Sequence, residues 1–214
     1  MKSTIDTDQN RSRLPEDGRW KGPGLAGMAG WLWGLVLFTL LVPVTACDDD
    51  LYKVDWELRP DTAYLFSLAR PELNLLSAFD FIARIPVKIE SPNATGRWDM
   101  VLDTQDGELV LLPPEAVGVP ESKARIIPMG DVAFEDVLKA PSDTTKYIAD
   151  EPVPVQVGHV YVIRTRQQSG AYGQLCVYYG KFEPLEQDPV AGTVSFLFDT
   201  SPVCNSRKLY PPKD

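Results

Sequence analysis

The chain is poor in the side chains that enzymes most often use for proton transfer and metal binding. Its 214 residues include a single histidine, His159, and three cysteines. No P-loop, G-x-S-x-G nucleophile elbow, H-E-x-x-H zinc motif or C-x-x-C pair occurs in it. A Ser-His-Asp or Cys-His arrangement would have to use His159. These absences exclude the enzyme classes that carry such motifs, whereas a hydrolase with dispersed carboxylates would leave no local motif.

Positive charge is also scarce. The chain carries 21 Lys and Arg residues against 30 Asp and Glu residues, which gives a net charge of −9. Beyond residue 46 the chain keeps 16 of these basic and 26 of these acidic residues, a net charge of about −10. An acidic surface gains nothing from binding phosphates, and anionic lipid headgroups repel it. We therefore expect no nucleic-acid partner, and we expect any membrane affinity to come from an anchor.

Long apolar runs are absent except for residues 25–46, which hold no charged side chain and are long enough to cross a membrane. Five basic residues precede this segment, and three aspartates follow it at 48–50. This asymmetry predicts a cytoplasmic N-terminus and an outward-facing remainder. The densest part, 31–42, is closer in length to the apolar region of a signal peptide. An uncleaved anchor helix and a cleaved signal therefore both remain open.

Residues 44–47, Val-Thr-Ala-Cys, resemble the lipobox of bacterial lipoproteins. The resemblance implies cleavage before Cys47, lipidation of its sulfur and attachment of the mature chain to a membrane of the bacterial cell envelope. Asp48 in the next position implies retention at the inner membrane, with the domain on the periplasmic side. We divide the chain accordingly into a basic cytoplasmic region (1–24), an apolar signal or anchor segment (25–46), an acidic tether (47–60) and a β-rich extracytoplasmic domain (61–214).

Lipidation of Cys47 would leave Cys176 and Cys204 as a pair. Because exported compartments are oxidising, we expect a disulfide between them, with two buried free thiols as the alternative. We expect strands at 174–182 and 193–199 that pair with Phe182 opposite Thr193. In that register Cys204 lies too far along the chain for a direct cross-strand bridge, so residues 200–202 must turn the tail back over the sheet. The bridge would then hold residues 205–210 against the domain.

Alternating apolar and polar residues predict short strands throughout the domain. Residues 97–103 place Trp98, Met100 and Leu102 on one face, and the turn residues 104–107 predict a hairpin over 97–112. Residues 83–90 alternate in the same way. Residues 159–166 are apolar on both faces, which predicts an interior strand.

One segment has helical spacing. Phe134, Val137 and Leu138 follow a capping residue, Asp131, and precede Pro141, so we expect a short helix over 132–140. Many short strands with one short helix predict a mainly β domain. We expect an antiparallel sandwich or a partly open barrel.

Few residues are candidates for a binding site. His159 begins the expected interior strand and Tyr161 lies within it, while Tyr178 and Tyr179 lie in the next strand. These four residues are candidates for ligand binding or docking, with core packing as the alternative. Acidic neighbours such as Glu135-Asp136 lack the alternating oxygen spacing of a calcium loop, so we predict no metal site.

Five segments resemble, in their order, the β-rich HmuY-like lipoproteins: RWDMVLD (97–103), FEDVLKAP (134–141), VYVIRTR (160–166), YYGKFEPL (178–185) and GTVSFLF (192–198). The resemblance implies a β-rich lipoprotein domain over roughly residues 98–198. The best-known members of that family bind haem through paired His or Met ligands. No such pair is matched here, because His159 stands alone and Met100 and Met129 match no ligand position. We therefore expect no cofactor, with haem as the alternative.

These observations predict a non-catalytic envelope protein, an accessory or scaffolding subunit that docks on a membrane-bound protein partner. A HmuY-like haem or small-ligand binder is the alternative, and a hydrolase with dispersed carboxylates is the third hypothesis. An enclosed apolar pocket with convergent polar groups would favour the ligand binder. A flat aromatic patch rimmed by charge would favour docking.

Overall fold

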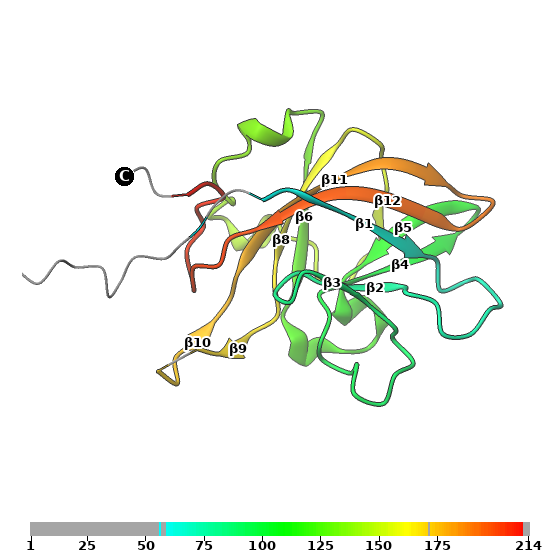
Figure 1. Ribbon diagram of the computed structural model, residues 1–214, viewed down its shortest axis with the longest axis horizontal. Helices are drawn as coiled ribbons and strands as arrows, with labels where there is room; N and C mark the ends of the chain where they lie inside the picture. The colour runs from blue at the N-terminus through cyan, green and yellow to red at the C-terminus, as the bar shows by residue number, and fades with distance from the viewer. Residues whose placement is uncertain (1–55, 57–58, 171, 212–214) are drawn as a thin grey trace, which may run out of the picture. The chain divides into compact units, whose positions relative to one another are not determined.

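The computed structural model describes Trp56, residues 59–170 and residues 172–211 (Figure 1). The predicted signal or anchor segment, the lipidation residue Cys47 and most of the acidic tether lie outside these residues. Within them, no helix is long and apolar enough to cross a membrane. The first strand begins at Asp61.

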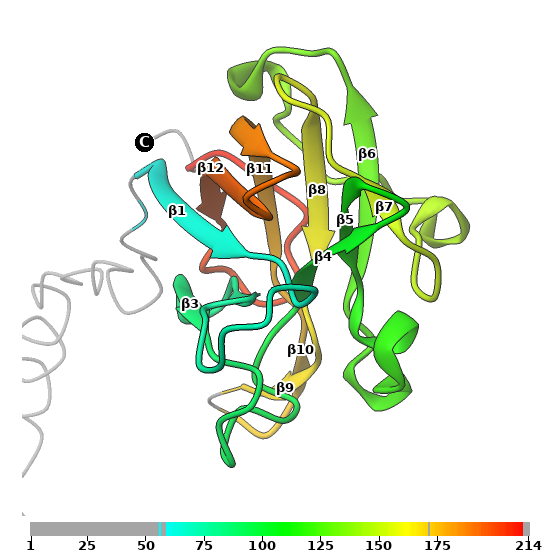
Figure 2. The same cartoon turned by 90° about the vertical axis from the view of Figure 1, so that its right-hand side faces the viewer.

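The described chain contains two large sheets, each of five antiparallel strands. The first sheet has the order β1 (Asp61–Phe66), β12 (Thr193–Thr200), β11 (Tyr179–Asp188), β8 (Val160–Arg164) and β6 (Arg125–Gly130). The second has the order β3 (Ile85–Val87), β2 (Ala78–Asp80), β4 (Met100–Gln105), β5 (Glu108–Leu112) and β7 (Val153–Pro154). Figure 2 shows the strands of the first sheet side by side, from β1 to β6. A small hairpin of β9 (Gln168–Ser169) and β10 (Leu175–Cys176) projects from one end.

The two large sheets share one apolar core. It is built from the inward side chains of both sheets, and its aromatic rings meet edge to face, as where the centroids of Phe79 and Phe198 lie 4.7 Å apart. Tyr161 stacks on Phe182 at 5.1 Å within the same core. The fold is therefore mainly β with antiparallel sheets that do not close into a barrel, which fits the predicted sandwich.

Two strand predictions are confirmed. The hairpin over 97–112 consists of β4 and β5, and its turn residues Asp106 and Gly107 have φ angles of 53° and 84°, as a tight hairpin turn requires. The predicted interior strand is β8, which lies between β11 and β6. The strand predicted over 83–90 is wrong in extent, because only Ile85–Val87 pairs, at the sheet edge.

The predicted helix over 132–140 is wrong. Only η5 (Phe134–Asp136) is helical there, as a 3₁₀ turn; the other described 3₁₀ turns are η3 (Pro114–Val117), η4 (Pro120–Ser122) and η6 (Thr144–Lys146). The backbone groups that an α-helix would pair locally are bonded to distant residues instead. Lys181 Nζ donates to the carbonyls of Phe134 and Val137, and the Ala140 N–H donates to the carbonyl of Arg207.

The predicted register of the last two strands is also wrong. Phe182 pairs with Phe198, and Thr193 pairs with Asp188, because β11 continues through residues 183–188 instead of turning there. Pro184 lies within β11, where a proline is tolerated because a bulge follows at Leu185. Cys176 precedes β11, and the tail beyond Thr200 returns to it as predicted. Cys176 and Cys204 lie at disulfide distance, with Cα atoms 5.1 Å apart.

Candidate functional site

The outer face of the first sheet has a covered part and an open part. Over β8 and β6 it is apolar, and the chain covers it with residues 131–149 and the C-terminal tail from residue 203. Phe134, Tyr147 and Leu209 of these covering segments are all buried there. Over β1 and β12 the same face is open to solvent, since Tyr64 is 46% exposed. The described residues thus cover this sheet surface over β8 and β6 and leave Tyr64 on β1 exposed.

The register of three strands defines the residues of the open part. On β12, Val194, Phe196 and Phe198 point into the core, so the alternate residues face outward. The same alternation on β1 points Ala63 and Leu65 inward. We call the outward surface the open face; it consists of Thr62, Tyr64, Phe66, Glu183, Leu185, Glu186, Asp188 and Ser195. Leu197 also points outward but packs against the covered part.

A β-bulge places three carboxylates on the open face. Glu183 pairs with Leu197, Glu186 with Ser195, and Asp188 with Thr193. In a regular strand, residues 183 and 186 would point to opposite sides. The extra residue at 185 shifts the register, so the carboxylates follow one another along the same side of β11.

The three carboxylates differ in whether they already accept hydrogen bonds from other groups of the protein. Asp188 accepts hydrogen bonds from the N–H groups of Val190 and Ala191, both at 2.9 Å, and so fixes the turn that follows β11. For Glu183 and Glu186 the described part of the chain supplies no hydrogen bond or ion pair. These two charges therefore remain available to a binding partner.

Aromatic side chains lie beside this acidic row. The rings of Tyr64 and Phe66 meet edge to face at 5.0 Å, and the Arg70 guanidinium lies 5.2 Å from the centre of the Phe66 ring. A shallow hollow of about 240 Å³ lies between the acidic row and Tyr64, with Ser195 in its lining. The open face thus places two aromatic rings beside a row of carboxylates and a hollow.

The sheet edges are poorly suited to adding a strand from another protein. Pro86, Pro128 and Pro154 lie in the edge strands β3, β6 and β7, where each removes a backbone donor. On β1 the Thr62 N–H is bonded to the Asp61 carboxylate, and the Phe66 N–H is bonded to the Leu76 carbonyl. A binding partner would therefore be expected to use a sheet face instead of a sheet edge.

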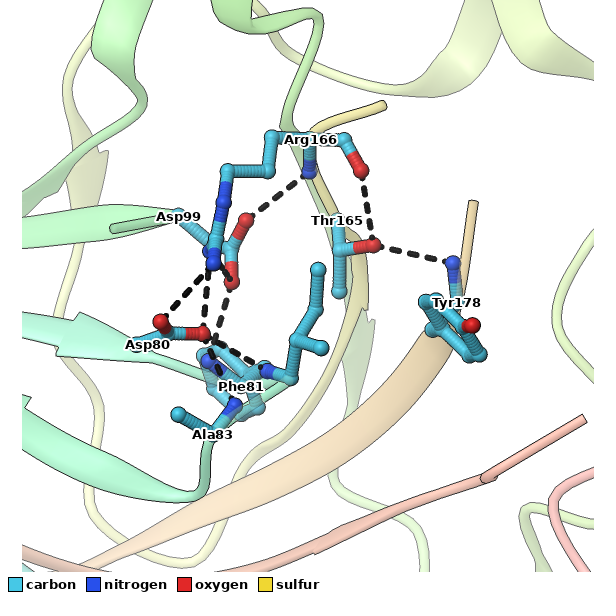
Figure 3. A network of polar contacts seen from close by, with 8 residues as sticks. Asp80, Phe81, Ala83, Asp99, Thr165, Arg166 and Tyr178 are labelled. Atoms are coloured by element: carbon cyan, nitrogen blue, oxygen red, sulfur yellow. Dashed lines mark hydrogen bonds and ion pairs between the residues drawn. The ribbon is translucent and has the colours of Figure 1, made fainter. Parts of the chain in front are cut away.

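A second group of charged residues is internal. The Arg166 guanidinium pairs with Asp80 at 2.8 Å and with Asp99 at 3.1 Å, and the side chains of Asp80 and Asp99 are 8% and 0% exposed. We call these three residues the clasp (Figure 3). Asp80 ends β2, Asp99 precedes β4, and Arg166 follows β8, so the clasp joins the two sheets.

Backbone donors complete the clasp. Asp99 accepts hydrogen bonds from the N–H groups of Phe81 at 2.9 Å and Arg166 at 2.8 Å, and Asp80 accepts from those of Ile82 and Ala83. Burial raises the pKa of Asp99 to about 6, although the charge of Arg166 and these N–H donors act in the opposite direction. Burial lowers the pKa of Arg166, but the hydrogen bonds and charges of both aspartates outweigh this effect and raise it. Arg166 forms ion pairs with both carboxylates, so the clasp stabilises the contact between the two sheets.

A buried lysine fixes the cover to the sheet. Lys181 is 3% exposed, and its Nζ lies 4.4 Å from the centre of the Phe134 ring while it donates to two carbonyl groups of the same segment. Burial lowers its pKa. Lys181 precedes Glu183 by one outward position on β11, so the boundary between the covered and open parts lies between these two residues.

The four residues predicted from the sequence for ligand binding or docking occupy different environments. Tyr161 is 1% exposed, and its hydroxyl donates to the Pro154 carbonyl at 2.8 Å and accepts from the Gln156 N–H. Tyr179 is 7% exposed and packs under the cover. Tyr178 and His159 are half-buried, at the base of β11 and just before β8. The structure does not bring these four together into one surface.

The residues of the open face and of the clasp were missed in the sequence. The alternation of DTAYLF at 61–66 could have predicted β1 and its outward Tyr64. Nothing in the sequence around Asp99 indicates that its side chain is buried, yet it is 0% exposed. Comparison with protein-family models, with curated proteins and with solved structures finds no match to the chain.

Proposed function

We propose that this protein is a non-catalytic, membrane-anchored protein of the bacterial cell envelope, and that its periplasmic domain docks on a protein partner as an accessory or scaffolding subunit. The proposal places the anchor at residues 25–46 or at a lipidated Cys47, as the sequence predicts. It places the docking surface at the open face. The observation that supports it is that the described part of the chain covers the first sheet over β8 and β6 and leaves the aromatic and acidic surface over β1 and β12 exposed.

The chemistry of the open face favours a partner with a basic surface. Glu183 and Glu186 would pair with Lys or Arg side chains, while Tyr64, Phe66 and Leu185 offer apolar contact area to the same partner. A second copy of this chain is a poor occupant, because the two acidic rows would face each other and each chain is already strongly negative.

The test is the size of the complex after mild detergent solubilisation. The wild-type protein should migrate on native gels as part of a larger assembly, and the double variant Glu183→Lys, Glu186→Lys should migrate as a free monomer. The double variant Glu90→Lys, Glu151→Lys makes the same change in charge at exposed positions outside the open face and should migrate like the wild type. A wild-type protein that migrates only as a monomer would exclude the docking function.

A HmuY-like ligand binder is the second candidate, and one observation favours it. Gly130 pairs with Val160, so the register of β6 and β8 places Met129 and His159 at the same end of the two neighbouring strands. A Met–His pair could ligate haem iron. Met129 packs against the covered part of the sheet, however, and neither residue lines the hollow on the open face.

A further inference from the structure

The hollow on the open face has an aromatic wall on β1, an acidic wall on β11 and a floor of small side chains on β12, which lies between them (Figure 2). Tyr64 and Glu186 both pair with Ser195, so these three residues form one row across the sheet. Asp188 and Thr193 belong to the next row, and all five residues line the hollow. We call this hollow the slot. Because neighbouring strands lie about 4.8 Å apart, its two walls stand on backbones about 10 Å apart.

The same combination of an aromatic ring and a carboxylate already holds an arginine elsewhere on this sheet. The Arg84 guanidinium lies 4.9 Å from the centre of the Phe198 ring and donates to the Asp199 carboxylate at 2.8 Å. A guanidinium suits such a place because it is planar and always charged. It can lie against a ring and donate to a carboxylate at the same time.

A second arginine of this kind lies beside the slot. The Arg70 guanidinium is 5.2 Å from the centre of the Phe66 ring, and its Nε donates to Glu72 at 3.1 Å. It also donates to the carbonyl of Ala191, which lines the slot, and the Phe66 ring meets that of Tyr64 edge to face. The positive charge of Arg70 is therefore already paired, and its donors are already used.

Tyr64 and Glu186 repeat this combination, but the described residues supply no cation to it. The tyrosine is 46% exposed, and the glutamate has no hydrogen bond or ion pair within the described part of the chain. Lys181, the cation of β11, is turned toward the covering segment. A cation–π contact spans up to about 6 Å and a charge-assisted hydrogen bond about 2.8 Å. One guanidinium is therefore long enough to contact both walls of the slot.

We propose that the slot binds an arginine side chain of the protein partner, with the guanidinium against the Tyr64 ring and its N–H groups donating to Glu186. Asp188 adds a second negative charge beside it. Lysine is a poorer occupant, because its ammonium has neither a plane to lie on the ring nor a fork of donors for a carboxylate. The inference rests on the proposed function, since it names the residue of the partner that the open face recognises.

The test is a titration of the full-length protein, labelled with ¹⁵N and held in detergent micelles, with a blocked pentapeptide that has one central arginine. Peptides with lysine or citrulline in its place are the matched probes, since lysine keeps the charge and citrulline keeps the shape without the charge. The arginine peptide should shift the amide resonances of Tyr64, Glu186 and Ser195 and bind more tightly than the lysine peptide. The citrulline peptide should leave these resonances unmoved.

Variants of the two walls show whether both contribute. Tyr64→Leu and Glu186→Gln should each weaken binding of the arginine peptide by about two- to fivefold. Tyr64→Phe keeps the ring and should bind the peptide more tightly than Tyr64→Leu. Tyr172→Leu makes the same change at a tyrosine that is 89% exposed outside the open face, and it should bind like the wild type.

Equal affinity for the arginine peptide and either of the other peptides would overturn the inference, as would an arginine peptide that shifts no resonance of the slot. Native gels of the same protein separate this inference from the docking function. An assembly that forms although the slot binds no arginine peptide retains docking and excludes the arginine. A protein that binds the arginine peptide but migrates only as a monomer supports arginine recognition and excludes docking.

Discussion

Replacing Asp99 by asparagine should change how the stability of the domain depends on pH. Burial raises the pKa of this carboxyl from 3.8 to about 6 in the folded protein. The folded state therefore binds a proton more tightly than the unfolded state, and the stabilisation from this proton is complete below the unfolded pKa near 4. It is lost as the pH rises through 6. A shift of about two pH units corresponds to about 3 kcal/mol.

The assay is urea unfolding at pH values from 4 to 7, in which the free energy of unfolding of the variant is compared with that of the wild type. The wild type should lose about 3 kcal/mol more than Asp99→Asn over this range. Asp103→Asn, at a half-buried aspartate on β4, is the control for the loss of one carboxylate. Parallel curves for Asp99→Asn and the wild type would refute the argument that burial of this charge sets the pH dependence.

Three further predictions concern the disulfide and His159 in the described structure and Cys47, which lies outside it. Removing the Cys176–Cys204 bridge, which closes a separation of 28 residues, should cost about 3–4 kcal/mol, and hydrogen exchange should accelerate first at residues 205–210; unchanged exchange there would contradict the tail contacts. His159→Gln should leave complex formation unchanged and cost about 1 kcal/mol or less, while a haem absorption band that disappears in this variant would favour the ligand-binding alternative. Cys47→Ala should block processing, and intact-mass analysis of the wild type should show an acylated chain beginning at Cys47; recovery of residues 1–46 in the mature protein would instead identify an uncleaved anchor.

Local sequence patterns correctly predicted the elements whose conformation depends on residues close together in the chain. The 97–112 hairpin follows from alternation and the Asp106-Gly107 turn, and the interior position of β8 follows from an apolar run on both faces. The helix over 132–140 failed because Lys181 and the C-terminal tail, both distant in sequence, take the backbone carbonyls and amides of that segment. The apolar residues of this segment have helical spacing, but these tertiary contacts determine its conformation instead.

The candidate site depends on strand pairing and ion pairs between residues that are distant in sequence. Local sequence patterns therefore could not predict it. The carboxylates of Glu183 and Glu186 share a face only because of the bulge at Leu185, which is a property of the pairing of β11 with β12. The clasp joins residues from 80 to 166 that no spacing rule connects. The disulfide was predicted from cysteine count and compartment, although the expected register of the neighbouring strands was wrong.

Photo-crosslinking from the open face tests whether this face binds a basic protein surface. A benzophenone amino acid at Ser195, in the middle of the open face, should give an adduct with a partner protein in intact cells. The adduct should be absent when the same probe replaces Glu151, and it should disappear when Glu183→Lys and Glu186→Lys are added to the Ser195 probe. No adduct from position 195, or an adduct that survives the charge reversal, would contradict the docking of a basic partner at the open face.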